Sequence, residues 1–315
     1  MKSERSAVLD QKRILVTGAG GMLGRILLTG EWSKKNSLVV GLAREKHGDL
    51  GVLACDLSVE AQVKKIFSDQ SFDLVVHTAA YSDVDGCERD PRRAHESNAL
   101  ASRYLAQACG QKNIPLIYVS TDYVFDGFKK SSYAESDRTC PVNIYGMTKL
   151  EGEYHTRKYS RISAIVRTSW LFGPGNPSNF VNHVLTRLKN EPAVAVLDDQ
   201  EDSPTYVRDL AGALQEIGAR LLDLKKKHPK KMVCETYHVC NSGTATRLEM
   251  ARWMKKYLGL ETVRVERADT KNIAGRLAVR PPHPVLSTAL YRKVFKAPLR
   301  SWKESLRDYL EGPAS

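Results

Sequence analysis

Short apolar runs alternate with amphipathic segments through the first half of the chain. Apolar runs predict strands at residues 13–17, 38–42, 72–77, 115–120 and 164–168. Between them, periodic apolar positions predict helices at 22–28, 94–109 and 145–159. Apolar strands separated by helices with one apolar face indicate a parallel sheet that is covered on both sides. The expected fold class is therefore α/β, with a Rossmann-type doubly wound parallel sheet.

The pattern becomes less regular after Trp170. A loop at 173–179 is followed by expected helices and strands without strict alternation: helices at 180–189, 207–224, 247–258 and 302–310, and strands at 193–197 and 236–240. We expect a dinucleotide-binding domain over residues 12–170, to which 205–243 partly return. A smaller, discontinuous α/β substrate-binding lobe is expected from 171–204 plus 244–312, and a flexible N-terminus from residues 1–11.

Composition and charge narrow the function classes. The 315 residues carry 48 Lys and Arg against 36 Asp and Glu, a net charge of +12, and the run at 225–231 supplies five of the positive charges. We interpret that run as a solvated loop, and without a zinc-finger or RNA-binding spacing we predict no nucleic-acid partner. The chain lacks both a long uncharged apolar run and an apolar N-terminal segment, so we expect a cytoplasmic protein with no membrane contact. Cysteine and histidine spacings predict no metal site.

A glycine-rich turn follows the first expected strand. Its glycines have the spacing GxxGxxG, and a helix pattern begins within it. Glycine lets the backbone approach a diphosphate closely, and the first turn of a helix offers free N–H groups to it. The sequence therefore predicts a dinucleotide site formed by Gly18, Gly20, Gly21, Met22, Leu23 and Gly24.

Two further residues bear on the adenosine end of that cofactor. Arg44 follows the second expected strand, where an acidic residue would favour NAD. A guanidinium can pair with a 2′-phosphate, so we expect NADP(H), with NAD(H) as the alternative and a solvated loop arginine as the non-functional reading. Asp56, followed by Leu57, is compatible with accepting a hydrogen bond from adenine and equally with capping the helix expected near 59–67.

A candidate proton-transfer group lies at the end of the fourth strand and the start of the next helix. Tyr145 and Lys149 share one helix face at i, i+4 spacing, and an ammonium near the phenol would lower its pKa. Thr121 ends the fourth strand, at the rim where open α/β sheets bind ligands. These three residues are the predicted catalytic set.

At this point the chain resembles the extended short-chain dehydrogenases/reductases, and within them the enzymes that reduce nucleotide-linked 4-keto sugars. The resemblance rests on VTGAGGMLG, HTAAYSDVDGCE, STDYVFDG, YGMTKLEGE, RTSWLFG, DDQEDSPTYVRDLA and RPPHPVLS, which span nearly the whole chain. It implies that further cofactor-binding residues are Ala79, Ala80, Tyr81, Asn98, Ser120, Tyr145 and Lys149. It also implies that the sugar would contact Val84, Thr121, Asp122, Tyr123 and Trp170, although Trp170 is equally compatible with a core aromatic.

The implied activity is NADPH-dependent reduction of dTDP-4-dehydro-L-rhamnose to dTDP-L-rhamnose, a glycan precursor. One alternative is a nucleotide-sugar epimerase or dehydratase, against which Arg44 and the short second lobe argue. Another is a non-catalytic NADP-binding subunit resembling the regulatory β subunit of methionine adenosyltransferase, which would act through a catalytic partner. The intact STD, RTSW and DQ-x-x-SPT segments favour the reductase.

Two departures from the family pattern matter. Ile26 stands where many bacterial members have a glutamate of a magnesium-bridged dimer, so we expect no such metal bridge, and a homodimer is only one possible assembly. Asp202 stands where many relatives have glycine, and an aspartate would disturb the turn if φ were positive there. Arg208 is compatible with a diphosphate contact and with a surface charge.

Overall fold

A seven-stranded parallel sheet forms the centre of the molecule. The computed structural model describes residues 9–30, 32, 37–45, 52–176, 179–268 and 276–312. Within them the strand order is β11-β6-β5-β4-β1-β2-β3, with every neighbouring pair parallel. Its strands are β1 (Arg13–Thr17), β2 (Leu38–Ala43), β3 (Val52–Ala54), β4 (Leu74–His77), β5 (Leu116–Thr121), β6 (Ile162–Thr168) and β11 (Val233–His238). The predicted α/β Rossmann-type fold is confirmed.

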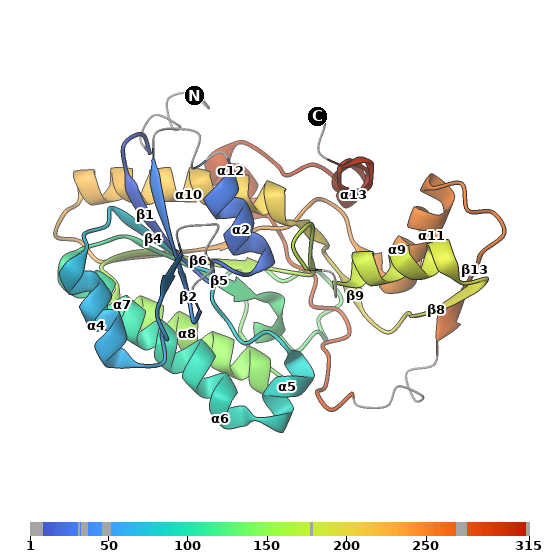
Figure 1. The fold of residues 1–315 in the computed structure, drawn as a ribbon, viewed down its shortest axis with the longest axis horizontal. Coiled ribbons are helices and arrows are strands. Elements are labelled where there is room, and N and C mark those ends of the chain that lie inside the picture. Colours follow the sequence, from blue (N-terminus) through green and yellow to red (C-terminus); the bar gives the residue numbers. More distant parts are fainter. Residues whose placement is uncertain are drawn as a thin grey trace.

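Helices cover both faces of this sheet (Figure 1). One face packs against α2 (Met22–Thr29) and α10 (Val207–Lys227), and the other lies under α4 (Glu60–Asp69), α7 (Ala101–Lys112) and α8 (Ile144–Tyr159). Successive side chains of a strand point to opposite faces. Ile14 and Val16 of β1 accordingly belong to the core under α2 and α10, while Leu15 belongs to the core under α4 and α7.

A smaller lobe lies beside the sheet, at the right of Figure 1. It contains α9 (Phe180–Asn190), α11 (Arg247–Tyr257) and the parallel pair β8 (Ala193–Leu197) and β13 (Arg264–Ala268). Short strand pairs connect it to the sheet: β7 (Leu171–Phe172) with β10 (Thr205–Tyr206), and β9 (Glu201–Asp202) with β12 (Ala245–Thr246). The chain thus leaves and re-enters the larger body several times.

Several details differ from the sequence predictions. The helix expected at 94–109 is interrupted: α5 (Val84–Arg89) and α6 (Pro91–Ala94) lead into a π-helical turn, His95–Leu100, before α7. A short 3-10 turn, Asp122–Val124, follows β5. The run at 225–231 is not wholly a loop, since its first three lysines form the last turn of α10, where cations favourably meet the negative end of the helix dipole.

The ends of the chain also depart from the expected domain division. Residues 1–8 of the predicted flexible N-terminus lie outside the described residues, but Leu9 is buried in the core. Helix α12 (Ala289–Phe295) lies beside α10 in Figure 1, whereas α13 (Trp302–Glu311) lies toward the smaller lobe, where Trp302 packs against Trp253 of α11 with ring centroids 5.9 Å apart. Tyr291 and Phe295 pack against Tyr237 of β11. Residues 289–295 therefore pack on the sheet of the larger body, while α13 contacts both bodies.

No helix within the described residues is both long and apolar enough to cross a membrane.

Candidate active site

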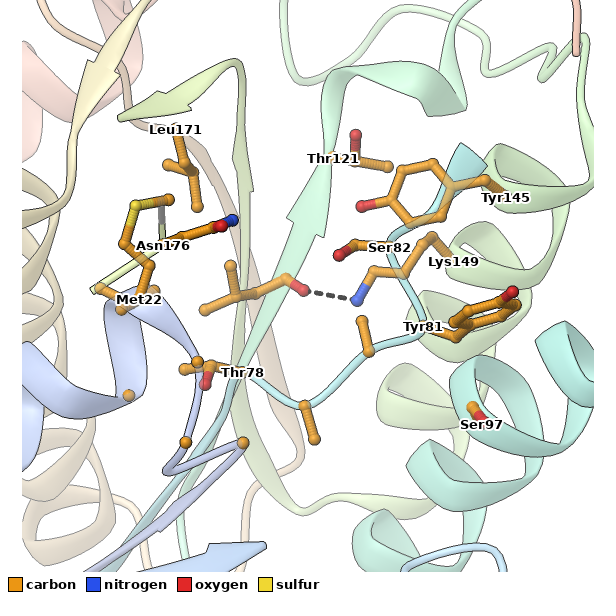
Figure 2. Close-up of a pocket in the computed structure, with 18 of the residues that line it drawn as sticks. Met22, Thr78, Tyr81, Ser82, Ser97, Thr121, Tyr145, Lys149, Leu171 and Asn176 are labelled. Atoms are coloured by element: carbon orange, nitrogen blue, oxygen red, sulfur yellow. Dashed lines mark hydrogen bonds between the residues drawn. The ribbon is translucent and has the colours of Figure 1, made fainter. Parts of the chain in front are cut away.

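A cavity of about 830 Å³ lies where the carboxyl ends of the parallel strands face the smaller lobe. Its walls come from the turn after β1, the segments after β2, β3, β4 and β5, helix α8, and residues of the smaller lobe. Figure 2 shows Thr121 and Tyr145 on one wall and Met22, Leu171 and Asn176 across from them. This is the rim at which open α/β sheets bind their ligands.

The glycine turn has the geometry that a diphosphate requires. Gly18 has φ of +69°, and a Cβ there would lie 2.7 Å from the Ala79 backbone nitrogen. At Gly24 a Cβ would lie 2.2 Å from the Gly18 carbonyl oxygen. A side chain at either position would clash with the backbone next to it and push the turn away. Glycine at both positions therefore leaves the N–H groups at the start of α2 facing the cavity.

The segments after β2 and β3 form the end of the cavity at which the sequence predicts the adenosine. Arg44 is exposed and lines the cavity, as a contact to a 2′-phosphate requires. Asp56 also lines it, but its Oδ1 accepts hydrogen bonds from the backbone nitrogen (2.9 Å) and hydroxyl (2.7 Å) of Ser58. Asp56 thus stabilises the turn before α4, whose N-cap residue is Val59. Both of these hydrogen bonds use Oδ1, and the adenine contact of Asp56 stays a prediction.

Asn98 lies behind the cavity wall and is not among the residues that line the cavity. Its Oδ1 accepts from the Tyr81 backbone nitrogen at 2.7 Å, and its Nδ2 donates to the Tyr81 carbonyl and to the Thr148 hydroxyl, both at 3.1 Å. The side chain is buried. Asn98 therefore holds Tyr81 and α8 together and orients the wall from outside.

Tyr145 and Thr121 lie together in the cavity. Loss of water around the phenol raises the pKa of Tyr145, and the negative charge of Asp122 raises it further, while a hydrogen bond with the Thr121 hydroxyl lowers it. The Tyr145 ring also packs edge-on against Tyr123, with centroids 5.9 Å apart. Tyr145 is accordingly a protonated phenol, poised to donate its proton.

The expected effect of Lys149 on Tyr145 is not seen. The Lys149 Nζ donates to the Val119 carbonyl at 2.7 Å, drawn as the dashed line in Figure 2, and lies 4.2 Å from the centroid of the Tyr118 ring. Burial lowers the pKa of Lys149 to about 7, against the raising effect of Glu153. The ammonium is thus held by the end of β5 and is a weak source of positive charge for the phenol.

A buried ion pair supports the floor of the site. The Glu153 carboxylate accepts hydrogen bonds from Arg167 Nε and Nη2, both at 2.8 Å, and from the Ser120 hydroxyl at 2.7 Å. All three side chains are buried. They tie α8 to β5 and β6, the three elements that carry or flank Tyr145, Lys149 and Thr121.

Two buried carboxyls, Asp122 and Asp202, line the cavity on either side of the Ser169 hydroxyl. Ser169 Oγ lies 2.9 Å from Asp122 Oδ2 and 3.3 Å from Asp202 Oδ1, and Thr121 donates to Asp122 Oδ1 at 2.9 Å. Burial raises both pKa values, and their mutual repulsion raises that of Asp202 well above its ordinary range. We predict from this that one of the two carboxyls is protonated at neutral pH. Asp202 lies in extended backbone in β9, so it does not disturb a turn.

Trp170 packs against the core and also lines the cavity. Its φ is +47°, an uncommon conformation for a bulky residue, and its ring stacks on Phe180 with centroids 5.5 Å apart. The left-handed backbone turns the indole toward the cavity at the end of β6.

One wall is tied down by Asp85 of α5, next to the cavity residue Val84. The Asp85 carboxylate accepts hydrogen bonds from the backbone nitrogens of Leu277 (2.8 Å) and Ala278 (3.0 Å) and from Arg280 (2.6 and 2.7 Å). The Arg280 guanidinium holds the pKa of this carboxyl well below its usual range. We call residues 276–280 the clasp, since they join the C-terminal part of the chain to α5.

Apart from Asn98, every predicted site residue lines this one cavity. It brings together Gly18, Gly20, Gly21, Met22, Leu23, Gly24, Arg44, Asp56, Leu57, Ala79, Ala80, Tyr81, Val84, Ser120, Thr121, Asp122, Tyr123, Tyr145, Lys149 and Trp170. Cavity residues that the sequence did not single out as contacts include Asn179, Asp202 and Arg247. Asp202 was noted only as a departure from the family pattern, and Arg247 carried no motif signal.

Comparisons with known proteins identify the family. A profile of the RmlD substrate binding domain matches residues 12–314. The dTDP-4-dehydrorhamnose reductase of Mycolicibacterium smegmatis is 36% identical over 307 residues, 96% of this chain and 87% of that protein. The spore coat polysaccharide biosynthesis protein SpsK of Bacillus subtilis is 33% identical over 96% of this chain and 98% of its own.

Among solved structures, the dTDP-4-dehydrorhamnose reductase of Bacillus anthracis in complex with NADP superposes with a TM-score of 0.84 at 29% identity, covering 96% of this chain and 99% of that one. These likenesses extend over the sheet, the smaller lobe and the segments that form the cavity. The chain belongs to the RmlD substrate binding domain family.

Proposed function

We propose that this chain reduces the 4-keto group of dTDP-4-dehydro-L-rhamnose with NADPH, giving dTDP-L-rhamnose. The observation that carries the proposal is that Thr121, Tyr145 and Lys149 line the same cavity as the glycine turn. The relatives named dTDP-4-dehydrorhamnose reductase and the NADP complex of the Bacillus anthracis enzyme support the substrate and the cofactor.

The residues present fit a dinucleotide. The glycine cradle at Gly18 and Gly24 would be filled by any Cβ, and it opens onto the cavity at the start of α2. Arg44 would pair with the 2′-phosphate, and Ala79, Ala80 and Tyr81 would line the path toward the nicotinamide. NADPH supplies the hydride when bound.

Proton delivery falls to Tyr145. Its raised pKa keeps the phenol protonated at neutral pH, so it can donate to the oxygen that develops negative charge on C4. Thr121 would donate a hydrogen bond to the same oxygen in exchange for its present bond to Asp122. Lys149, fixed by the Val119 carbonyl, would hold the ribose of the cofactor.

The test is the variant Tyr145→Phe, with Tyr154→Phe as a matched control. Tyr154 lies on the same helix but is 54% exposed and outside the cavity. NADPH oxidation would be followed with dTDP-4-dehydro-L-rhamnose, and NADPH binding by fluorescence. We expect Tyr145→Phe to lose about 10²- to 10⁴-fold in kcat with NADPH affinity unchanged, and Tyr154→Phe to behave as the native protein.

Unchanged turnover in Tyr145→Phe would refute the catalytic assignment. Native protein that binds NADPH and turns over no nucleotide-linked 4-keto sugar would favour the regulatory-subunit alternative. The intact Thr121, Tyr145 and Lys149 set favours turnover. A cytoplasmic location and a homodimeric assembly stay predictions from the sequence.

A further inference from the structure

Three cationic side chains line the cavity within the described residues: Arg44, Lys149 and Arg247. Arg44 follows β2, at the end where the adenosine of a dinucleotide would lie. Lys149 is committed to the Val119 carbonyl beneath Tyr145. Arg247 enters from the smaller lobe, at the opposite end from Arg44. A nucleotide sugar carries a doubly charged diphosphate, and this end of the cavity must provide a cation for it if the proposed function is correct.

The surroundings of Arg247 hold its guanidinium in one plane. The guanidinium carbon lies 5.2 Å from the centroid of the Trp170 ring and 5.8 Å from that of Phe180, and these two rings stack on each other. Arg247 Nη1 donates to Gln200 Oε1 at 2.9 Å. Stacking on aromatic faces leaves the edges of a guanidinium, with its five donors, available for two parallel hydrogen bonds to an oxyanion.

The charge of Arg247 is less compensated than that of the arginines nearby. Arg276 pairs with Asp199 at 2.5 Å and Arg280 with Asp85 at 2.6 Å. Arg247 donates instead to the neutral amide of Gln200. A nearby acid on the cavity wall is Asp202, and burial together with the neighbouring Asp122 raises the pKa of its carboxyl, which favours the uncharged form. A guanidinium in this setting attracts an anion from solution.

The position of Arg247 in its helix supports the same conclusion. It is the first residue of α11, which is capped reciprocally by Thr246 and Glu249. The N-terminus of a helix carries partial positive charge, so an arginine there is unfavourable by itself. An anion bound at this place would be stabilised by the side chain and the helix together.

We propose that Arg247 binds the diphosphate of the nucleotide-sugar substrate, with Trp170 and Phe180 fixing the plane of its guanidinium. This inference rests on the proposed function and deepens it by assigning the anchor of the nucleotide part. It also resolves the alternative left open for Arg208. That residue is exposed on α10 and lies outside the cavity, so it is a surface charge.

The experiment measures how the NADP-saturated protein binds dTDP, dTMP and thymidine by titration calorimetry. The variants are Arg247→Gln and Arg247→Lys, with Arg208→Gln as the matched control. We expect Arg247→Gln to weaken dTDP binding about 10- to 100-fold, as loss of a bidentate charge-assisted pair does, and to leave thymidine binding within about twofold. Arg247→Lys keeps the positive charge but loses the two parallel donors of the guanidinium, so its dTDP affinity should lie between those of the native protein and Arg247→Gln. Arg208→Gln should match the native protein.

Three outcomes would overturn the inference. Equal weakening of dTDP and thymidine would show a structural effect of the substitution. Unchanged dTDP binding in Arg247→Gln would show that the diphosphate binds elsewhere. If this variant bound NADPH more weakly while its dTDP affinity stayed the same, Arg247 would be assigned to the cofactor. Native protein that fails to bind dTDP would refute both this inference and the proposed substrate. Binding that depends on Arg247 without any turnover would refute the proposed reaction alone.

Discussion

Replacement of Asp202 by asparagine should stabilise the protein at alkaline pH. Asp122 and Asp202 are each 3% exposed and share hydrogen-bonding distance to one hydroxyl, that of Ser169. An asparagine has the same shape as aspartic acid, and its amide donates the hydrogen bond that the shared proton otherwise supplies. Asp202→Asn therefore removes the second negative charge while keeping the packing of the site.

The sign and size follow from the raised pKa values of the pair. An unfolded aspartate has a pKa of about 3.9, so above that pH the folded protein keeps a proton that the unfolded chain releases. The free energy of unfolding of the native protein then falls by about 1.4 kcal/mol per pH unit, up to the folded-state pKa. Two carboxylates about 4 Å apart repel by about 4 kcal/mol at an effective dielectric constant of about 20, which limits this interval to about three pH units.

The assay is urea unfolding of the native protein and Asp202→Asn at pH 5 to 9. The difference between the two cancels the titration of all other groups. We expect Asp202→Asn to gain about 1.4 kcal/mol per pH unit from pH 5 to about pH 7, about 3 kcal/mol in all, and to gain no more at higher pH. Glu201→Gln, on the same strand but outside the cavity, should give a difference that does not vary with pH in this way. A flat difference for Asp202→Asn, or one that decreases as pH rises, would refute the shared proton.

Two further substitutions test the cofactor end and the floor of the site. Arg44→Ser should raise KM for NADPH about 10- to 100-fold with KM for NADH nearly unchanged, because only NADPH has a 2′-phosphate to lose its partner. Equal changes for both cofactors would contradict that contact. Glu153→Gln should lower the free energy of unfolding by about 3–5 kcal/mol, since it leaves the buried Arg167 without its counter-charge. A loss below about 1 kcal/mol, the usual worth of an exposed pair, would show that Arg167 finds another partner.

The sequence predicts the features that depend on neighbours along the chain. The apolar runs of β1, β4, β5 and β6 are buried on both faces of the sheet, so each is recognisable alone. The glycine turn needs only the spacing of its glycines. Tyr145 and Lys149 are four residues apart on one helix, which fixes their common face.

The features that escaped prediction depend on contacts between distant segments. Asp202 meets Asp122 only because β9 lies beside the end of β5, and no local pattern reports that two carboxyls share a proton. The Lys149 ammonium donates to the Val119 carbonyl because α8 packs against β5, and this contact depends on the tertiary structure. The π-helical turn at 95–100 breaks the 3.6-residue period, and it is this turn that carries Asn98.

The clasp has a consequence for how the protein is made. Asp85 is synthesised early, yet its partners at 277–280 are made almost two hundred residues later. Domains begin to fold during synthesis, which proceeds at about 5–20 residues per second. The Asp85 carboxylate of α5 is therefore without its partners for roughly ten seconds or longer. Chains cut short before residue 276 should still form most of the sheet, but α5 would lack the contacts of Asp85 with the clasp. In such chains this wall of the cavity would be the part most accessible to quality-control proteases.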